Sequence, residues 1–532
     1  VDDGSAGAGL VQLLPGSITS VSSDGNVVPY GVLNNGDTWV NPLFVSDPDD
    51  PNSRNLSNRE LRILPQRAVT IEGKDVDLAE GAEVDLSGGG DLLAGEFSAG
   101  VGGTRDWLTG YYDEDYNWVS GGGVYAILPG YDAGIAPVGL SSGGPQVGER
   151  IYLSGGSGLE AGYYTLLPAE YALLPGAYRV SAQHQYEGDF TGMRLGTTSM
   201  RHDGSSLQAG YRYVGEMANR DDRTNAFLVM PRETLFQRSS YNIQLASGYF
   251  SSEAFLEKAL RENREVPDAP RTPLDGGSIV LSATGSLNLE SSINTQAADG
   301  GRGGLADIQA QKIAVLGPDT DRAQYDGYLI LDSAQLNALT ADSLLLGGVR
   351  RQGEVNLELT TGATEVVVDN QGTVLTGSEL LFASLGDITV KQGSRIEASG
   401  TVSGGANNLR VVPVAAALID DKGNINEDDD ELIHNALDYG TVLRLSANRQ
   451  IDILRDPEAV DRLAALAADP AALAALNERR AAYGLAPVSN GGALTVEDGA
   501  SLVSNTSLTM DATINTMIDE GASIAAKQIS AS

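Results

Sequence analysis

The first candidate for catalytic chemistry is a Gly-x-Ser-x-Gly pattern at Gly139–Gly143, which would make Ser141 a hydrolase nucleophile. Such a nucleophile stands on a sharp turn between a buried strand and a helix. Here Gly144 and Pro145 follow the pattern directly, and they begin no such helix. A chain this rich in Gly and Ser contains such patterns by chance, so we expect Ser141 to have no catalytic role.

Histidine and cysteine chemistry is equally limited. The histidines form no His-Glu-x-x-His zinc motif, and no carboxylate pattern completes a catalytic zinc site; they are His184, His202 and His434. His202 precedes Asp203 in a stretch rich in Gly and Ser, which predicts an exposed side chain in a loop. Because the sequence has no cysteine, it excludes disulfides, thiolate metal sites and cysteine nucleophiles.

Acidic residues are grouped in the stretch DDKGNINEDDDE, at positions 420–431. An EF-hand loop needs acidic residues at its first, third and fifth positions and Gly at its sixth. Lys422 occupies the third position and Gly423 the fourth, so the stretch is not an EF-hand. Two interpretations remain, a solvated acidic loop or a looser calcium site, and the candidate ligands are Asp428, Asp429, Asp430 and Glu431.

Tyrosines are concentrated in residues 104–230, where a short apolar pattern ending in Pro occurs at Tyr125–Pro129, Tyr164–Pro168 and Tyr171–Pro175. Each copy predicts a short strand stopped by Pro, because Pro cannot donate a hydrogen bond to a sheet. Exposed aromatic rings stack on sugars and anchor protein contacts. We therefore predict a ligand-binding surface formed by Tyr125, Tyr131, Tyr164, Tyr171 and Tyr178. The alternative is that these rings form the core of a compact β-rich module.

The elements that would position such residues repeat along the chain. The windows Val76–Gly88, Ile388–Gly400 and Leu494–Thr506 share apolar residues at their first, third and ninth positions, and Gly followed by Ala or Ser in the turn between. A weaker copy, Thr516–Ile524, places its Gly 22 residues after that of the preceding window. A strand, a Gly turn and a strand that return about every 20 residues predict a solenoid of stacked coils.

Solenoids built from parallel strands also include polysaccharide lyases and hydrolases, in which carboxylates from successive coils catalyse bond cleavage. Asp77, Asp85 and Glu397 are polar residues inside the repeated strand motifs. The alternation of a strand places them on the outer face, where an acidic residue is solvated in any case. An enzyme of this type therefore remains the alternative to a binding protein.

The net charge of −36 limits the partners of the 532-residue chain. Binding to nucleic acid and docking on anionic lipid both require clustered Lys and Arg. Hydrophobic residues make up 41% of the chain, enough for a buried core, yet no apolar run approaches the roughly 18 residues of a membrane span. We therefore expect a folded protein that binds no nucleic acid and does not insert into a membrane.

Two segments interrupt the strand pattern with helical periodicity. Ser251–Glu265 has an apolar face and a Ser-Ser-Glu start. In residues 455–484, Asp456-Pro457 and Asp469-Pro470 each provide an N-cap and a first helical residue for an Ala- and Leu-rich helix. The second segment predicts an αα-hairpin on the outside of the solenoid.

These patterns together predict an all-β protein, a solenoid interrupted by excursions. We expect coils with long loops in residues 1–103, a Tyr-rich β module inserted at 104–235, a helical connector at 236–275 and further coils at 276–532. The last part contains an acidic excursion at 419–438 and the αα-hairpin at 455–484.

A family resemblance is carried by three stretches: Gly162–Val180 (GYYTLLPAEYALLPGAYRV), Val124–Gly130 (VYAILPG) and Ala82–Gly90 (AEVDLSGGG). With them the chain resembles the large exoproteins of the filamentous haemagglutinin family, which Gram-negative bacteria secrete by two-partner systems. The stretch with repeated Leu-Leu-Pro is the specific part, whereas Gly-turn repeats are common to many solenoids. The resemblance extends over most of the chain.

The resemblance implies a right-handed parallel β-helix with excursions, exported through an outer-membrane two-partner secretion transporter. It further implies a secreted or surface-exposed adhesin of a Gram-negative bacterium, active in attachment, aggregation or biofilm formation. The partner would be a glycan or a cell-surface receptor, and we expect a monomer without catalytic residues.

Two features of the family are not found in the sequence, an N-terminal secretion domain with Asn-Pro-Asn-type motifs and a recognisable C-terminal effector. We therefore expect an internal piece of a longer exoprotein. Because some members carry C-terminal toxins for contact-dependent inhibition, a passive shaft that presents a distal effector is a further alternative.

Overall fold

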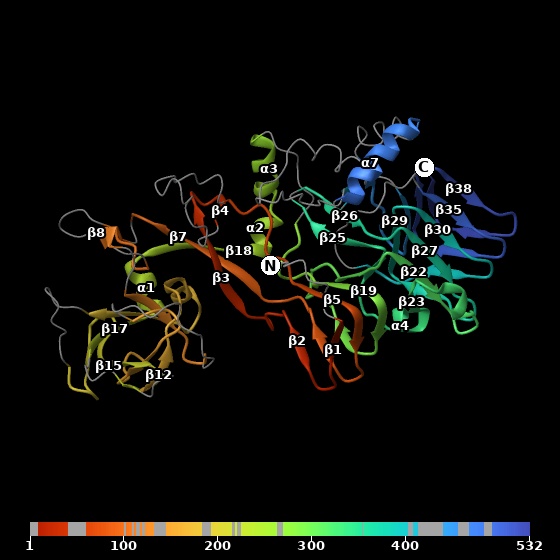
Figure 1. The fold of residues 1–532 in the computed structure, drawn as a ribbon. Helices are drawn as coiled ribbons and strands as arrows, with labels where there is room; N and C mark the ends of the chain where they lie inside the picture. Colours follow the sequence, from red (N-terminus) through yellow and green to blue (C-terminus); the bar gives the residue numbers. More distant parts are fainter. Residues whose placement is uncertain are drawn as a thin grey trace. The chain divides into compact units, whose positions relative to one another are not determined.

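The computed structural model is mostly β-strand with few short helices, which confirms the all-β class expected from the sequence. It describes residues 9–40, 60–100, 103–108, 111–112, 118–119, 123–131, 145–183, 193–214, 219–220, 225–262, 270–353, 355–402, 408–412, 440–455, 468–482 and 492–531. The chain divides into two compact units (Figure 1). Unit 1 comprises Val1–Asn26, Arg62–Asp91 and Phe250–Ser532, and unit 2 comprises Val27–Leu61 and Leu92–Tyr249.

This division corrects the expected domain boundaries. Unit 2 begins well before residue 104 and continues past residue 235, because one of its sheets joins strands that are distant in the sequence. The order of that sheet is β18 (Ser240–Leu245), β7 (Asp91–Ser98), β3 (Val27–Asn34) and β4 (Thr38–Val40). The expected connector at 236–275 therefore contains a strand as well as helices. Local periodicity gives no information on which distant strands pair.

Unit 1 is organised around a long sheet and the sheets that follow it along the chain. The order of the long sheet is β1 (Leu10–Leu13), β5 (Ala68–Leu78), β19 (Ser278–Leu289), β21 (Leu305–Gln309), β24 (Ser343–Leu346), β29 (Glu379–Ser384), β33 (Thr441–Ser446), β37 (Ser507–Ala512) and β40 (Gln528–Ala531). The second sheet has the order β23 (Leu329–Asp332), β22 (Lys312–Leu316), β27 (Glu365–Asp369), β30 (Asp387–Val390), β35 (Ala493–Val496) and β38 (Asn515–Ile518).

Smaller sheets complete unit 1. The third sheet has the order β28 (Leu375–Gly377), β31 (Arg395–Ala398), β36 (Ser501–Ser504) and β39 (Ser523–Ala525). A corresponding sheet near the N-terminus has the order β2 (Ile18–Ser20), β6 (Glu83–Asp85) and β20 (Ser292–Asn294). The outer sheet has the order β25 (Gly348–Gln352), β26 (Leu357–Thr361), β32 (Leu409–Val412) and β34 (Ile453–Leu454).

The chain passes through the second, third and long sheets in turn, as the order β35, β36, β37 followed by β38, β39, β40 shows. The repeated sequence windows are hydrogen-bonded neighbours: Ile388 of β30 pairs with Leu494 of β35, and Leu494 with Thr516 of β38. Ile396 of β31 likewise pairs with Leu502 of β36. The structure therefore places corresponding positions of these windows side by side.

Not all strands of unit 1 are parallel. In the long sheet β33 runs antiparallel to both of its neighbours, β29 and β37, and in the outer sheet β25 and β26 are antiparallel. The expectation of a solenoid made only of parallel strands is therefore wrong for these pairs. Alternating side chains have the same period in both directions, so the apolar pattern of β33 could not reveal its direction.

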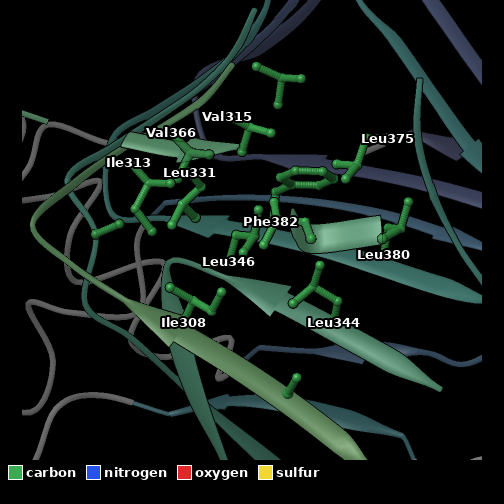
Figure 2. Packing of buried hydrophobic residues seen from close by; sticks show 14 of the residues in the cluster. Ile308, Ile313, Val315, Leu331, Leu344, Leu346, Val366, Leu375, Leu380 and Phe382 are labelled. Atoms are coloured by element: carbon green, nitrogen blue, oxygen red, sulfur yellow. The ribbon is translucent and has the colours of Figure 1, made fainter. Parts of the chain in front are cut away.

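The core of unit 1 is one hydrophobic cluster to which the long, second and third sheets all contribute side chains. In the long sheet, Ile308, Leu346 and Phe382 are register partners on successive strands, and Figure 2 shows them in the same core. Val315 and Val366 face them from the second sheet (Figure 2). Alternate residues of β24, β29 and β33 enter this cluster, and the residues between them are buried as well, on the opposite face of the sheet.

Polar residues of the repeat windows lie on the opposite face of these strands. Asp77 stands between the buried Val76 and Leu78, and its carboxylate accepts hydrogen bonds from Gln12 Nε2 (2.6 Å) and Asn288 Nδ2 (2.9 Å) on the neighbouring strands. Asp85 and Glu397 alternate with buried residues in the same way. The expectation that these acids point outward is confirmed.

Unit 2 contains an antiparallel sheet that closes on itself. Its order is β10 (Val124–Ile127), β13 (Tyr178–Gln183), β17 (Asn225–Pro231), β15 (Ser206–Val214), β11 (Arg150–Leu153) and β12 (Gly162–Thr165), with β14 (Thr198–Met200) and β16 (Asn219–Arg220) paired to β15. Ala126 of β10 and Leu167, just after β12, exchange two backbone hydrogen bonds and so join the ends of the sheet. The enclosed cluster includes Ile151, Phe227 and Val229.

The Pro-terminated repeat of unit 2 forms two different structures. Its first two copies are the strands β10 and β12, as predicted. The third copy is a 3-10 helix, η2 (Ala169–Leu173), so the predicted third strand is wrong. Tyr171 N donates to Pro168 O (3.1 Å) and Leu174 N to Tyr171 O (3.1 Å), and these turns bury Ala172 and Leu173. The short interval between two prolines favours local turn bonds over sheet pairing.

The predicted helices begin where their caps were expected. Helix α3 (Glu253–Arg261) follows Ser252, whose side chain accepts a hydrogen bond from Phe255 N (3.2 Å). Helix α7 (Pro470–Ala482) follows Asp469, whose Oδ1 accepts from Ala471 N (3.1 Å) and Ala472 N (3.2 Å). The first helix of the αα-hairpin and the acidic excursion 419–438 lie outside the described residues.

The remaining elements are β8 (Tyr111–Tyr112), β9 (Trp118–Val119), α1 (Arg232–Arg238), α2 (Ala246–Phe250), η5 (Arg322–Tyr325) and α4 (Ser333–Asn337).

Candidate binding site

The tyrosines that the sequence singled out lie mainly inside unit 2. Tyr125 and Tyr164 are only 7% and 8% exposed and belong to the cluster enclosed by the closed sheet. Their hydroxyl groups donate to backbone carbonyls, Tyr125 to Pro145 and Tyr164 to Glu160 (2.7 Å). Burial raises the pKa of both hydroxyls. These two rings are placed as core residues, which is the alternative that the sequence left open.

The other three predicted tyrosines are half-buried and are packed on apolar clusters. Tyr131 and Tyr171 lie against the cluster around Leu167 and Leu173, and Tyr178 lies against the core of the closed sheet. Burial raises the pKa of the Tyr171 and Tyr178 hydroxyls. The five predicted tyrosines are thus divided between two apolar clusters and do not form one common surface.

A different set of tyrosines forms a patch on the outer face of the closed sheet, which we name the tyrosine patch: Tyr152, Tyr163, Tyr211 and Tyr213. Tyr152 of β11 is the register partner of both Tyr163 on β12 and Tyr211 on β15. Tyr213 follows Tyr211 by two residues and therefore lies on the same face. Three neighbouring strands thus present a row of aromatic rings.

The rings of the tyrosine patch are held in fixed contact with one another. Tyr152 stacks on Tyr211 with ring centroids 5.1 Å apart, and it meets Tyr163 edge to face at 5.2 Å. Tyr163 also contacts Tyr213 at 5.3 Å, and the hydroxyls of Tyr163 and Tyr211 are hydrogen-bonded at 2.8 Å. These are favourable aromatic geometries. Tyr163 is 49% exposed, so the supported patch presents one ring to solvent.

This arrangement suits recognition of a flat, polar ligand such as a sugar ring. Aromatic rings supply rigid contact area at a low cost in side-chain entropy, and a tyrosine hydroxyl beside the ring supplies a donor and an acceptor. Arg150, the register partner of Tyr213, adds a cation on the same face of β11. The alternation in Arg150-Ile-Tyr152 and Tyr211-Arg-Tyr213 was a sequence signal for this face, which the search for Pro-terminated repeats missed.

A groove on unit 1 is lined in part by carboxylates. It has a volume of about 920 Å³ and is lined by Glu83 of β6, Asn294 of β20, Asp299, Thr340 and Asp342. Glu83 and Ser292 are register partners on neighbouring strands, so the groove runs across successive coils. Carboxylates from successive coils are the arrangement expected of a polysaccharide-cleaving enzyme. Asp77, Asp85 and Glu397 do not line this groove.

Asp203 connects a turn of unit 2 to helix α1. Its carboxylate accepts hydrogen bonds from Ser205 N (3.0 Å) and Ser205 Oγ (2.6 Å), and it forms an ion pair with Arg238. Thr234 Oγ1 donates to Asp203 O (2.8 Å). The hydrogen bonds from Ser205, together with the ion pair, lower the pKa of Asp203 from its usual 3.8 to about 2.

We expect Asp203→Asn to destabilise unit 2 at neutral pH and to have little effect at pH 2. Because the pKa of Asp203 is depressed in the folded state, its stabilising contribution is complete above pH 4–5 and is lost as pH falls towards 2. The measurement is chemical unfolding of the protein and the variant at pH 7, 5, 3 and 2, followed by tryptophan fluorescence. The Arg238 guanidinium lies 4.8 Å from the centre of the Trp107 ring, so this probe is local. If the free energies of unfolding of the protein and the variant differed by the same amount at every pH, the depressed pKa of Asp203 would not be the cause of the difference.

Several other predicted residues lie outside the described residues. They include the candidate calcium ligands Asp428, Asp429, Asp430 and Glu431, the Gly139–Gly143 pattern, His184 and His434. His202 is exposed in a turn, as predicted. Within the part of the chain that the structure describes, no group of three or more His, Cys, Asp or Glu residues is arranged to hold a metal ion. In the same part, no helix has the length and apolar character needed to cross a membrane.

Comparison of the chain with models of protein families, with curated proteins and with solved structures found no match.

Proposed function

We propose that the protein is a non-enzymatic bacterial adhesin in which unit 2 binds a glycan through the tyrosine patch. The observation that carries the proposal is the row of mutually supported rings on three neighbouring strands, with Tyr163 half exposed at 49%. Binding of a flat polar ligand needs aromatic area and nearby polar groups, and no catalytic residue is required.

In this proposal unit 1 is a right-handed parallel β-helix that acts as a stiff shaft. The support is its strand register: β30, β35 and β38 are parallel neighbours, and the chain passes through the second, third and long sheets before it returns. Each coil is then hydrogen-bonded to the next and shares an aliphatic core with it. Such a stack resists bending, which suits a protein that holds a binding surface away from a cell.

The proposed setting is the outer surface of a Gram-negative bacterium, or the medium around it, reached through an outer-membrane two-partner secretion transporter. The support is the resemblance of the Leu-Leu-Pro stretches to the filamentous haemagglutinin family. The absence of cysteine and the net charge of −36 suit a chain that is exported unfolded and stays soluble. There it would act in attachment, aggregation or biofilm formation as a monomer, bound to a glycan or a cell-surface receptor, with calcium as an optional ligand of the acidic excursion.

We expect Tyr163→Ala to weaken binding to the glycan by tenfold or more, because an aromatic anchor at the centre of an interface contributes about 2 kcal/mol. The measurement is a glycan-array screen with the full chain, in calcium and in EDTA, followed by affinities of the variants for each hit. Tyr163→Phe retains the ring and should retain most of the affinity.

Met200→Ala is the matched control, because Met200 is an exposed apolar residue of unit 2 outside the patch, 57% exposed. Unchanged binding by a folded Tyr163→Ala variant would contradict the role of the tyrosine patch. If the native chain binds no glycan or cell surface, the passive shaft that presents a distal effector becomes the better proposal.

A second candidate function is cleavage of a polysaccharide, and the groove with Glu83, Asp299 and Asp342 favours it. The same array hits can be assayed for new reducing ends. If the native chain cleaves a glycan, and Glu83→Gln or Asp342→Asn abolishes this cleavage, the enzyme proposal replaces the adhesin proposal. Binding without turnover would support the adhesin.

A further inference from the structure

The sheets of unit 1 end in strands that have a neighbour on one side only. Among the described strands, β1 and β2 end their sheets at the N-terminal side, and β38, β39 and β40 end theirs at the C-terminal side. Alternate backbone N–H and C=O groups of such an edge strand have no partner strand, so the edge can pair with a strand of another chain. Unit 1 therefore has two open ends.

The same unit of a strand, a turn and a strand is found at both ends, and we name this unit an arc. The C-terminal arc consists of β38, residues 519–522 and β39, and the N-terminal arc consists of β1, residues 14–17 and β2. Their strands and turns have the same lengths. Gly16 and Gly521 occupy the same position in the turn, and each is followed by Ser or Ala, as in the repeated windows.

The C-terminal arc is joined to the arc before it, β35 and β36, by two backbone hydrogen bonds that define how arcs stack. Asp519, the residue after β38, donates from its N to the O of Val496, the last residue of β35 (2.9 Å). Ser523, the first residue of β39, donates from its N to the O of Ala500, the last residue of the turn (2.8 Å). In both bonds the later arc donates and the earlier arc accepts.

The N-terminal arc obeys the same rule with the arc that follows it, the second half of β5 and β6. Ala79 N donates to Leu13 O (3.1 Å), and Glu83 N donates to Ser17 O (2.9 Å). Leu13 is the last residue of β1, and Ser17 is the last residue of the turn. One pattern of hydrogen bonds therefore stacks arcs at both ends of unit 1.

The two open ends carry the complementary halves of this pattern. Ile518 O and Ala522 O are the acceptors that a further arc would use at the C-terminal end, and Leu14 N and Ile18 N are the donors that a preceding arc would use at the N-terminal end. Within the part of the chain that the structure describes, no strand follows β38 and β39 or precedes β1 and β2 in their sheets.

The hydrophobic core of unit 1 is also incompletely covered at these ends. Leu13 at the N-terminal end and Ile524 at the C-terminal end pack against the main cluster but are only partly buried. Ile518 is 48% exposed. Val496 and Leu502, the register partners of Ile518 and Ile524 in the preceding arc, are fully buried. One more arc on either end would bury apolar area in the same way.

We propose that unit 1 binds a second copy of this chain head to tail, with the N-terminal arc of one copy stacked on the C-terminal arc of the other. The equal lengths of the arcs and the rule for stacking fix one parallel register. In that register the opposed residues are Val11 with Thr516, Leu13 with Ile518, and Thr19 with Ile524.

This register satisfies the open edges and closes the core at once. Leu14 N of one copy would donate to Ile518 O of the other, and Ile18 N would donate to Ala522 O, as the internal arcs do. The first half of β5, residues 68–73, has an edge that β1 does not cover, because β1 pairs only with Asp75–Leu78. β40 of the other copy would lie beside it and continue the long sheet.

Charge favours contact between unlike ends. The segment Leu10–Ser20 contains no charged residue, whereas Asp519 and Glu520 stand in the turn of the C-terminal arc. Two C-terminal arcs would bring these carboxylates of two copies together, and like charges opposite one another are destabilising. In a chain with a net charge of −36, an uncharged end is the better partner for the acidic one.

A head-to-tail contact leaves one free end of each kind on every assembly, so the assembly can grow by further copies. The proposal departs from the monomer described in the proposed function. It does not depend on binding of a glycan by the tyrosine patch, which belongs to unit 2.

The test is analytical ultracentrifugation of the full chain over a wide range of concentration. We expect the mean mass to rise with concentration and to pass that of a dimer. Leu13→Lys blocks the N-terminal arc and Ile518→Lys the C-terminal arc, and each should weaken association by roughly tenfold or more, because the contact would bury an unpaired charge. Leu260→Lys is the matched control and should associate as the native chain does, because Leu260 is 61% exposed on α3, away from both arcs.

Mixing the two blocked variants identifies which ends meet. Each variant retains one free end of a different kind, so an equimolar mixture should form a dimer and nothing larger. A contact between two like ends would instead let one of the variants associate by itself. That result, or a native chain that stays monomeric at every concentration, would overturn the proposal.

A second measurement needs no variant, in case a blocked variant does not fold. Hydrogen exchange of the native chain should show that the amides of Leu14 and Ile18 become protected as concentration rises. Equal exchange of these amides in dilute and concentrated samples would also overturn the proposal.

Discussion

Replacement of Arg350 by methionine is expected to lower the free energy of unfolding of unit 1 by about 3–5 kcal/mol. The reason is that the substitution leaves the Asp307 carboxylate without its ion-pair partner. The Asp307 side chain is 0% exposed and the Arg350 side chain 1% exposed, and Arg350 Nη2 lies 2.7 Å from Asp307 Oδ1. Arg350 also donates to Ser343 Oγ (2.6 Å), so the substitution removes several hydrogen bonds at once. Without its partner, the Asp307 carboxylate is buried and uncompensated.

A double variant, Asp307→Leu with Arg350→Met, removes both charges of the ion pair. It therefore separates the effect of losing the pair from the effect of leaving one buried charge without its partner. Replacing both members of a buried pair by apolar residues is often neutral or stabilising, so the double variant should be more stable than Arg350→Met alone. The measurement is hydrogen exchange of β21, β24 and β25, because a stacked array unfolds in parts and one global midpoint does not describe it. If the losses in stability from the two single substitutions simply add up in the double variant, Asp307 and Arg350 do not stabilise each other.

Phe382→Ala is expected to cost about 3–5 kcal/mol, the range measured for truncating a buried aromatic residue in a core. Phe382 is fully buried on β29, and it lies between Leu346 and Leu443 in the register of the long sheet. The stacked strands on either side share the same hydrogen-bond ladder, so they cannot close easily on the space that the ring leaves. The removed contacts and the cavity both add to the loss.

The matched control is Ile518→Ala on β38, because Ile518 is 48% exposed and loses little buried area. We expect it to change stability by less than about 1 kcal/mol. Hydrogen exchange should show faster opening of β24, β29 and β33 in Phe382→Ala and native rates in unit 2. A Phe382→Ala variant as stable as the Ile518→Ala control would show that this core adapts to a lost ring.

Local patterns predicted a substantial part of the fold. The windows at Ile388 and Leu494 are paired residue by residue, because the same spacing of apolar residues and Gly turns must recur wherever coils stack. Ser252 and Asp469 cap helices as predicted, because an N-cap acts on its own first turn. The caps depend only on neighbouring residues, and the recurring windows depend only on a local spacing that each copy repeats.

The same reasoning failed where a distant segment determines the structure. Tyr125 and Tyr164 were predicted on a binding surface and lie in a core, since the sequence does not show which face of their strands the closed sheet encloses. The antiparallel direction of β33 was missed because its alternating pattern reads the same both ways.

The sequence by itself determined the all-β class, the recurrence of the strand and Gly-turn windows, the outward direction of Asp77 and the exclusion of cysteine chemistry. Each of these follows from the composition, from a period of two along a strand or from a turn within a few residues. Only the tertiary structure decided which tyrosines meet, that Arg350 and Asp307 form a buried ion pair, and that β3 and β4 belong to unit 2. The physical reason is that apolar faces and unpaired strand edges are alike along the chain, so their partners are chosen only when all of them pack together.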